Sequence, residues 1–363
     1  MSDQAPSGSG SSPGKPGGRP GSKPGGRSGG KPGGRSGGKP GGRSGGQPGG
    51  PRRDRGEGGP KRRRFPSVQI TVACDDRDLE RLTSRYRVLE LTSSAAGPLT
   101  ERTLGLLVDR TPDGFRIDVR AHRLLTQQPA PTESLWADVR DKLPAAVRSK
   151  PQLFPDELSP TVLDATLDRF VAQIKPLYEF DKLGTVVFQF PSYFTPSPKS
   201  LDYLVWLRDR CGDLPLAVEL RRREWVDTKH REETLAFLEE HRLTYVCVDA
   251  PQGTDTAVPP VAAATTDLAV VRLHGRDLAA WERGVDDPLA RFRYEYRRSD
   301  LEPWIPRLEK LAAGGRTVHV IVTTAPGDSA ARSASLLAKV LTEPPGSKPP
   351  EPPPRSGPPR RRR

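Results

Sequence analysis

The stretch from residue 217 to 225, Ala-Val-Glu-Leu-Arg-Arg-Arg-Glu-Trp, joins an alternating apolar pattern to a carboxylate and a guanidinium. Glu219 and Arg221 fall where the strand-like pattern ends, before a helical pattern at 234–242. Polar groups at the carboxyl end of a strand are typical of active sites in α/β proteins. Together with Asp249 and His274 on later segments, Glu219 supplies the candidate acid and base groups.

Arginine and glutamine side chains, which donate hydrogen bonds, occur near the ends of this and other strand-like segments. Three arginines have the planar donor geometry that suits a phosphate or carboxylate, namely Arg221, Arg272 and Arg276. Gln189 ends another strand-like segment and adds an amide. These residues predict a site for a small anionic ligand, and the sequence specifies no cofactor.

Two other interpretations of the same residues stay open. Glu219, Asp249 and His274, with Glu90, are also the residue types that bind divalent metals, although three nearby arginines oppose a metal ion. A purely structural network, such as Glu219–Arg221 with Asp249–Arg272, would also pair these charges inside a barrel. No nucleophile motif and no nucleotide-binding glycine motif is found in the chain.

Eight strand-like segments carry these residues, and most are followed by a helical pattern. The segments are Val68–Ala73, Val88–Thr92, Phe115–Ala121, Thr185–Phe190, Leu216–Leu220, Thr244–Val248, Leu268–Leu273 and Val318–Val322. Eight strands that alternate with helices predict an α/β protein with a TIM (β/α)₈ barrel. We expect Thr100 to cap one helix, and Ser299 with Glu302 to form a capping box on another.

The period of two along each strand predicts which side chains face the barrel interior. We expect the polar faces to point inward, as in the sets Asp118, Arg120 and His122; Glu219 and Arg221; Tyr245, Cys247 and Asp249; Arg272 and His274; His319 and Thr323. The opposite, apolar faces suit the surrounding helices. Polar side chains inside a barrel are costly unless they are paired or bind a ligand.

Two connections are irregular. About 60 residues separate the third and fourth strands, with helical patterns at 132–142 and 160–175, which is long enough for an insertion or lid beside the barrel mouth. The segment 250–267 is rich in Pro, Thr and Ala and has little helical pattern, which is compatible with a barrel that lacks one helix there.

Charge divides the chain into a basic tail at 1–64, a barrel at 65–342 and a second tail at 343–363. The first tail holds 15 Lys and Arg against three acidic residues and contains an eight-residue repeat beginning at Lys23. The second tail has a net charge of +4, so the barrel itself carries −3 of the total of +13. Both tails are too poor in apolar residues to fold, and we expect them to be disordered and able to attract nucleic acid non-specifically.

Cysteine usage and hydropathy indicate the compartment. Cys74, Cys211 and Cys247 are widely spaced, which argues against a disulfide framework or a structural zinc site. No apolar run is long enough to cross a bilayer, and no signal peptide is found. We therefore expect a cytoplasmic protein without a membrane partner.

Four motifs, in order and spacing, resemble the YecE-like family, the domain of unknown function 72. They are Leu-Gly-Thr-Val-Val-Phe-Gln-Phe-Pro from 183, Val-Glu-Leu-Arg from 218 with Trp225, Asp-Ala-Pro from 249, and Val-Arg-Leu-His-Gly-Arg from 271. The resemblance covers roughly 68–341 and implies a TIM barrel. It implies no activity, because none is established for the family.

The chain departs from the family pattern at several pocket positions. Val72-Ala-Cys-Asp-Asp76 replaces an opening Gly-Thr-Ser-Gly-Trp, Arg120 replaces a lysine, and Thr323-Thr324 replace two asparagines. We therefore expect an enzyme, or a former enzyme, that acts on or binds a small anion at the carboxyl-terminal face of the barrel. The alternative is a non-catalytic binding module that its basic tails tether to nucleic acid.

Overall fold

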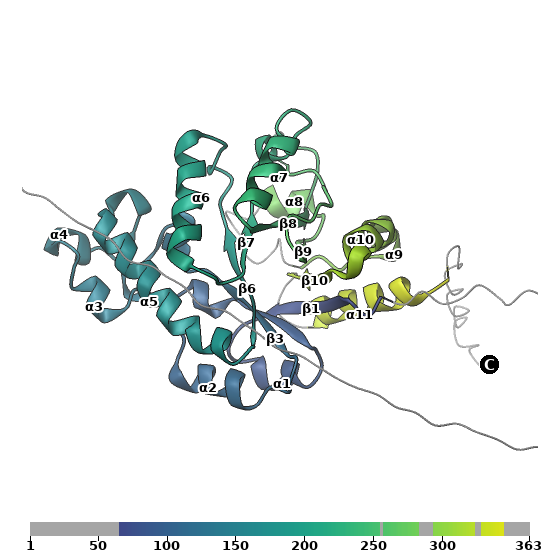
Figure 1. Cartoon of the computed structure of the whole chain (residues 1–363), viewed down its shortest axis with the longest axis horizontal. Coiled ribbons are helices and arrows are strands. Elements are labelled where there is room, and N and C mark those ends of the chain that lie inside the picture. Colours follow the sequence, from purple (N-terminus) through teal and green to yellow (C-terminus); the bar gives the residue numbers. More distant parts are fainter. Residues whose placement is uncertain (1–64, 255–256, 283–292, 324–327, 345–363) are drawn as a thin grey trace, which may run out of the picture. The chain divides into compact units, whose positions relative to one another are not determined.

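Eight parallel strands close into a barrel in the computed structural model, which describes residues 65–254, 257–282, 293–323 and 328–344 (Figure 1). Their bounds are β1 Val68–Cys74, β2 Val88–Leu91, β3 Arg116–Arg120, β6 Leu183–Gln189, β7 Leu216–Glu219, β8 Leu243–Asp249, β9 Leu268–Leu273 and β10 Thr317–Val322. They follow one another around the barrel in chain order, and β1 closes it against β10. The eight predicted strands and the TIM (β/α)₈ barrel are confirmed.

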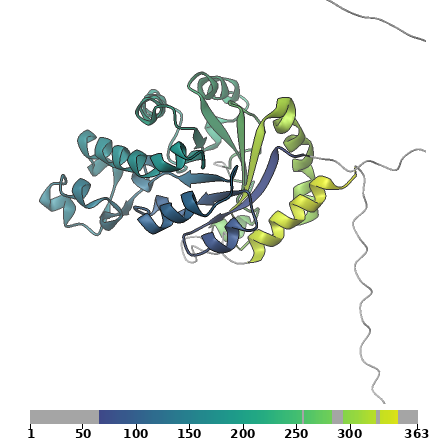
Figure 2. The ribbon, with the colours of Figure 1, turned by 60° about the horizontal axis from the view of Figure 1, so that its bottom comes forward.

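Helices lie around the outside of the strands (Figure 2). The α-helices are α1 Leu79–Thr83, α2 Glu101–Asp109, α3 Ala137–Arg140, α4 Ala145–Arg148, α5 Pro160–Glu179, α6 Pro198–Cys211, α7 Arg231–Glu240, α8 Leu278–Glu282, α9 Arg298–Leu301, α10 Ile305–Ala312 and α11 Asp328–Thr342. Short 3₁₀ turns are η1 Ser93–Ala95, η2 Arg123–Thr126, η3 Thr132–Ser134, η4 Pro155–Glu157, η5 Arg223–Trp225, η8 Glu302–Trp304 and η9 Ala313–Gly315. The described part of the segment between β8 and β9 contains no helix, as predicted.

The helix ends show which capping predictions hold. The Thr100 hydroxyl accepts a hydrogen bond from the Thr103 amide at 3.1 Å, so the predicted cap of α2 is confirmed. The predicted capping box of Ser299 and Glu302 is wrong. Instead the Asp300 carboxylate accepts from the Arg297 amide at 2.8 Å, which starts α9 two residues earlier than the box implied.

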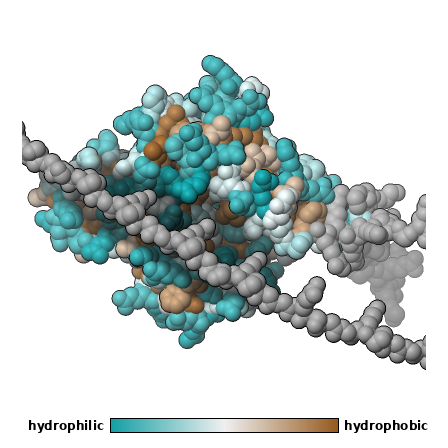
Figure 3. Space-filling model, viewed as in Figure 1, coloured by the Kyte–Doolittle hydropathy of each residue, from teal (hydrophilic) through white to brown (hydrophobic). Residues whose placement is uncertain are grey.

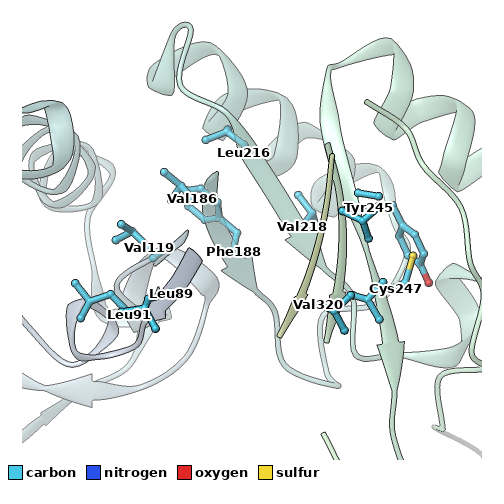
Figure 4. Close-up of a cluster of buried hydrophobic side chains, with 14 of the residues drawn as sticks. Leu89, Leu91, Val119, Val186, Phe188, Leu216, Val218, Tyr245, Cys247 and Val320 are labelled. Carbon is cyan, nitrogen blue, oxygen red and sulfur yellow. The ribbon is translucent and has the colours of Figure 1, made fainter. Parts of the chain in front are cut away.

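Apolar side chains on the outer strand faces form the main core with the helices. Figure 4 shows part of this layer, including Leu89, Phe188 and Val218. A smaller apolar cluster fills the barrel interior, formed by Val187, Ala217, Val246, Val248, Val270 and Ile321. Burial of both faces is the expected state of a parallel sheet between helices and a filled barrel.

The predicted inward face of the sixth strand, β8, is wrong. Val246 and Val248 belong to the interior cluster, whereas Tyr245 and Cys247 lie in the outer core (Figure 4). The β-ladder explains this orientation, because Tyr245 pairs with the outward-facing Val218. Choosing the more polar face as the inner one failed because tyrosine and cysteine pack as apolar residues against a helix layer.

The connection between β3 and β6 contains the predicted insertion. Two short strands, β4 Ala130–Pro131 and β5 Gln152–Leu153, pair in an antiparallel sheet. The elements η3, α3 and α4 lie between them in the chain, and the long helix α5 follows. The insertion has its own small core around Leu124, Leu135 and Leu153. The helix predicted at 132–142 is thus broken into short pieces, and that at 160–175 extends to Glu179.

The outer surface seen in Figure 3 is mainly hydrophilic, with separate smaller hydrophobic areas. No helix within the described ranges has the length and hydropathy needed to span a membrane. The predicted basic tails lie outside the described residues, apart from Glu343 and Pro344.

Candidate functional site

The Glu219 carboxylate is the centre of a buried polar cluster at the carboxyl-terminal end of the barrel. It is the last residue of β7 and is fully buried. It accepts hydrogen bonds from Gln189 Nε2 at 2.7 Å, from His274 Nε2 at 2.9 Å, and from Arg272 Nη1. These donors come from the end of β6, which is next to β7, and from the end of β9, which is two strands away beyond β8, so the closed barrel brings the predicted residues together.

An aromatic stack holds the loops that follow β6 and β7. Phe194 packs between Phe190 and Trp225, with ring centroids 4.0 and 5.6 Å away. Trp225 Nε1 donates to the Phe194 carbonyl oxygen at 2.7 Å. Because Phe190 follows Gln189 directly, this stack fixes the backbone on both sides of the Gln189–Glu219 hydrogen bond.

Arg272 lies between two carboxylates and is itself buried, with 1% of its surface exposed. Its Nη1 pairs with Glu219, and its Nη2 lies 2.9 Å from Glu90 Oε1. Burial alone would raise the pKa of Glu219, but Arg272 and His274 outweigh burial and hold that pKa well below its usual range. Glu219 is therefore an ionised anchor for the surrounding donors.

Glu90, on β2, is the second carboxyl of the cluster and has the opposite electrostatic character. Burial raises its pKa, and the neighbouring carboxylates Glu219 and Asp118 act in the same direction. Arg272 and Arg120 oppose this rise without cancelling it. Two carboxyl groups whose pKa values move apart are typical of sites that use both protonation states.

Arg120, the last residue of β3, reaches the same cluster. Its Nη2 donates to Gln189 Oε1 at 2.5 Å, and its Nε lies 3.8 Å from Glu90. Burial and the nearby Arg272 cation lower the pKa of Arg120 to about 10. A guanidinium whose charge is incompletely balanced by its neighbours is a favourable place for an anion.

Arg221 and Trp281 form the outer part of the cluster. The Arg221 side chain is 26% exposed, and its Nε lies 4.0 Å from Glu219 Oε1. The Arg221 guanidinium carbon lies 4.7 Å from the centroid of the Trp281 ring, which meets His274 edge-on. Trp281 comes from α8, whose apolar helical pattern gave no indication of a site residue.

Both ring nitrogens of His274 make hydrogen bonds. Nε2 faces Glu219, and Nδ1 lies 2.8 Å from the hydroxyl of Thr323. Burial lowers the pKa of His274 to about 4, despite the opposing effect of Glu219. The imidazole is therefore neutral at physiological pH and serves as a hydrogen-bond donor to Glu219.

Asp249 and Arg276 belong to a different network. The Asp249 carboxylate accepts from Arg276 at 2.7–3.1 Å, from the Tyr296 hydroxyl at 2.7 Å, and from Trp304 Nε1 at 3.0 Å. The inner face of β8 is the opposite of the predicted one. Asp249 therefore points toward the loops after β9 instead of toward Glu219. The anticipated Asp249–Arg272 pair is wrong, because Arg272 pairs with Glu219 and Glu90.

His122 also lies away from the cluster, contrary to the predicted inner face. β3 ends at Arg120, so the period of two does not extend to residue 122. The His122 ring instead contacts Ser134 of the insertion, with Nε2 3.1 Å from both Ser134 oxygens.

The described site residues have more cationic than anionic charge. Three guanidinium groups, from Arg120, Arg221 and Arg272, surround the ionised Glu219 and the less acidic Glu90. Within the described residues, no group of three or more His, Cys, Asp or Glu side chains is placed to hold a metal ion. The arrangement suits binding of an oxyanion by forked donors.

Comparison with known proteins assigns the chain to a family. The family described as "Protein of unknown function DUF72" matches residues 71–356. The UPF0759 protein YunF of Bacillus subtilis is 27% identical over 279 residues, covering 76% of this chain and 90% of YunF.

Solved structures agree on the fold. A DUF72 family protein from Enterococcus faecalis V583 has a TM-score of 0.62 at 23% identity, covering 76% of this chain and 97% of that one. Another from Thermotoga maritima MSB8 has a TM-score of 0.60 at 23% identity, covering 76% and 99%. With the family match spanning most of the barrel, this chain belongs to the DUF72 family of proteins of unknown function.

Proposed function

We propose that the barrel binds a small oxyanion, a carboxylate or phosphate, at its carboxyl-terminal face. The observation that supports this most is the surplus of guanidinium groups over ionised carboxylates in the buried cluster. The lowered pKa of Arg120 supports it further, because a bound anion would relieve the repulsion between Arg120 and Arg272.

Arg120 and Arg221 are the residues that we propose contact the anion. Both side chains keep some exposure, 18% and 26%, whereas Arg272 is enclosed by its two carboxylates. Gln189 fixes Arg120, and Trp281 supports Arg221. Arg276 and Asp249 neutralise each other and shape the neighbouring loop.

Binding is favoured over acid–base catalysis by the hydrogen bonds of the candidate catalytic groups. Glu219 accepts from three donors and has a lowered pKa, and His274 is neutral with both nitrogens engaged. Neither group is poised to exchange a proton with a ligand. Asp249 is equally enclosed by its donors.

Ligand-induced stabilisation tests this proposal. Sulfate, phosphate and citrate should raise the melting temperature of the wild type in a saturable manner, because they bind the native state selectively. In Arg120→Gln and Arg221→Gln, the same rise in melting temperature should require at least ten times more anion. Arg102→Gln, on the exposed face of α2, is the matched control and should behave as the wild type. Equal responses in all four proteins would contradict the proposal.

A second function is favoured by the charge distribution, with the basic residues concentrated in 1–64 and 343–363 and a net charge of −3 on the barrel. We propose that the tails attract nucleic acid non-specifically. Affinity for duplex and single strands should then fall steeply with salt and be lost when residues 1–64 are removed. The same affinity with and without that segment would exclude this assignment.

A further inference from the structure

The Glu90 carboxyl is buried without the hydrogen bonds that such a group normally needs. It has 0% exposure, and within the described residues neither of its oxygens makes a hydrogen bond. Its nearest cation is Arg272, whose Nη2 forms an ion pair with Oε1 at 2.9 Å. A buried carboxylate in this situation is costly, whereas a protonated carboxyl is much less so.

The groups that face Glu90 come from four other strands. Arg272 lies on β9, Arg120 and Asp118 on β3, Glu219 on β7 and Cys74 on β1. Two of them are cations that favour the ionised form of Glu90, and Glu219 is an ionised carboxylate that disfavours it. The charge on Glu90 therefore depends on how strongly Arg120 and Arg272 act on it.

We propose that Glu90 is the proton-carrying residue of the site and that the oxyanion binds together with a proton held on Glu90. This inference rests on the proposed function. An anion held by Arg120 and Arg221 adds negative charge beside Glu90 and offsets the field of Arg120, so it favours the protonated carboxyl. By linkage, a proton on Glu90 must strengthen anion binding by the same free energy.

The raised pKa of Glu90 is consistent with this assignment, because burial already favours its neutral form before any anion binds. The alternative proton acceptor is His274, which is also buried and also lies beside Arg221 and Glu219. His274 differs because both of its ring nitrogens are engaged, by Glu219 and Thr323. Protonation of Glu90 weakens only its ion pair with Arg272, which keeps Glu219 as a partner.

Calorimetric titration of the full chain with sulfate tests the proposal, since sulfate carries no titrating proton near neutral pH. At about pH 8, binding heats in two buffers of different ionisation enthalpy should reveal proton uptake by the wild type. Glu90→Gln keeps the side-chain size and should bind sulfate without uptake, with an affinity that no longer falls as pH rises. Glu80→Gln, on the exposed face of α1, is the matched control and should retain the uptake.

A measurement on the wild type alone covers the case in which Glu90→Gln does not fold. The infrared spectrum of the sulfate-saturated protein at the same pH should contain the carbonyl band of a buried protonated carboxyl. Sulfate binding without proton uptake and without that band would overturn this inference and leave the proposed function intact. Uptake that persists in Glu90→Gln would also overturn it, in favour of His274. No sulfate binding by the wild type would overturn both.

Discussion

Gly184 lies directly against Asp118, near the amino-terminal end of β6. A Cβ atom at residue 184 would be 2.3 Å from Asp118 Oδ1 and 3.2 Å from His319 Cε1. Asp118 is fully buried and its carboxylate pairs with His319 Nδ1 at 2.9 Å. The glycine on β6 thus leaves room for a buried polar pair between β3 and β10.

Gly184→Ala should therefore destabilise the protein strongly. The added methyl group must displace Asp118, and displacing one member of a buried pair costs about 3–5 kcal/mol. Gly105→Ala is the matched control, because its Cβ would have only Asp109 Oδ2 nearby, at 3.8 Å. In the middle of α2, alanine should stabilise by about 0.5–1 kcal/mol. Urea denaturation measures both, and similar free energies of unfolding for the two variants would contradict the assigned packing.

The eight strands could be predicted because each is a short run of alternating or continuously apolar residues, bounded by turns. The strand faces were harder to assign. For Glu219 and Arg272 the more polar face is the inner one, because ionisable groups meet there. For β8 the same rule failed, since Tyr245 and Cys247 pack among apolar side chains. Only the pairing of β8 with its neighbour decides between the two faces.

The candidate site was predicted in part for a related reason. Gln189 lies on β6, next to β7, whereas Arg272 lies on β9, two strands away from β7. Both reach Glu219 because they share the inward face of a closed barrel. Trp281 lies on a short helix after β9, and its contact with Arg221 depends on the path of a loop. The sequence indicates Glu90 as a possible metal ligand and gives it no acid–base role, because its missing hydrogen bonds are visible only in three dimensions.

Arg272→Met should cost about 3–5 kcal/mol of stability, because it leaves the buried Glu219 without its main counter-charge. The double variant Arg272→Met/Glu219→Gln should recover part of that loss, since no unpaired charge remains at residue 219. Arg221→Gln, at a partly exposed position, should change stability by about 1 kcal/mol or less. Urea denaturation of the three proteins tests this order, and an Arg272→Met variant as stable as Arg221→Gln would refute it.

Acidification should destabilise the protein through His122. Its Nδ1 accepts from the Leu124 amide, and burial lowers its pKa to about 4. Between about pH 6.5 and pH 4 the unfolded chain binds a proton at this residue and the folded chain does not. The contribution of His122 to the free energy of unfolding is therefore fully present above pH 6.5. It is lost as the pH decreases toward 4, by up to roughly 3 kcal/mol.

His122→Asn should reduce that pH dependence, because asparagine accepts the same backbone hydrogen bond without titrating. The measurement is the difference in unfolding free energy between pH 7 and pH 5, in the wild type and the variant. His274 contributes in the same direction in both proteins and cancels from the comparison. An unchanged difference would mean that protonation of His122 is not what destabilises the fold.

The boundaries of the folded unit can be tested to within a few residues. Phe65 packs against the main core, and Glu343 forms an ion pair with Arg298 of α9. Removing residues 1–64 and 345–363 should leave the melting temperature unchanged. Removing residues 1–67 should cost about 1–2 kcal/mol through the loss of Phe65. Ending the chain at Thr342 should cost about 0–1 kcal/mol, a loss that salt reduces because the Arg298–Glu343 pair is partly exposed. A clear fall in melting temperature on removing residues 1–64 alone would show instead that the basic segment packs on the barrel.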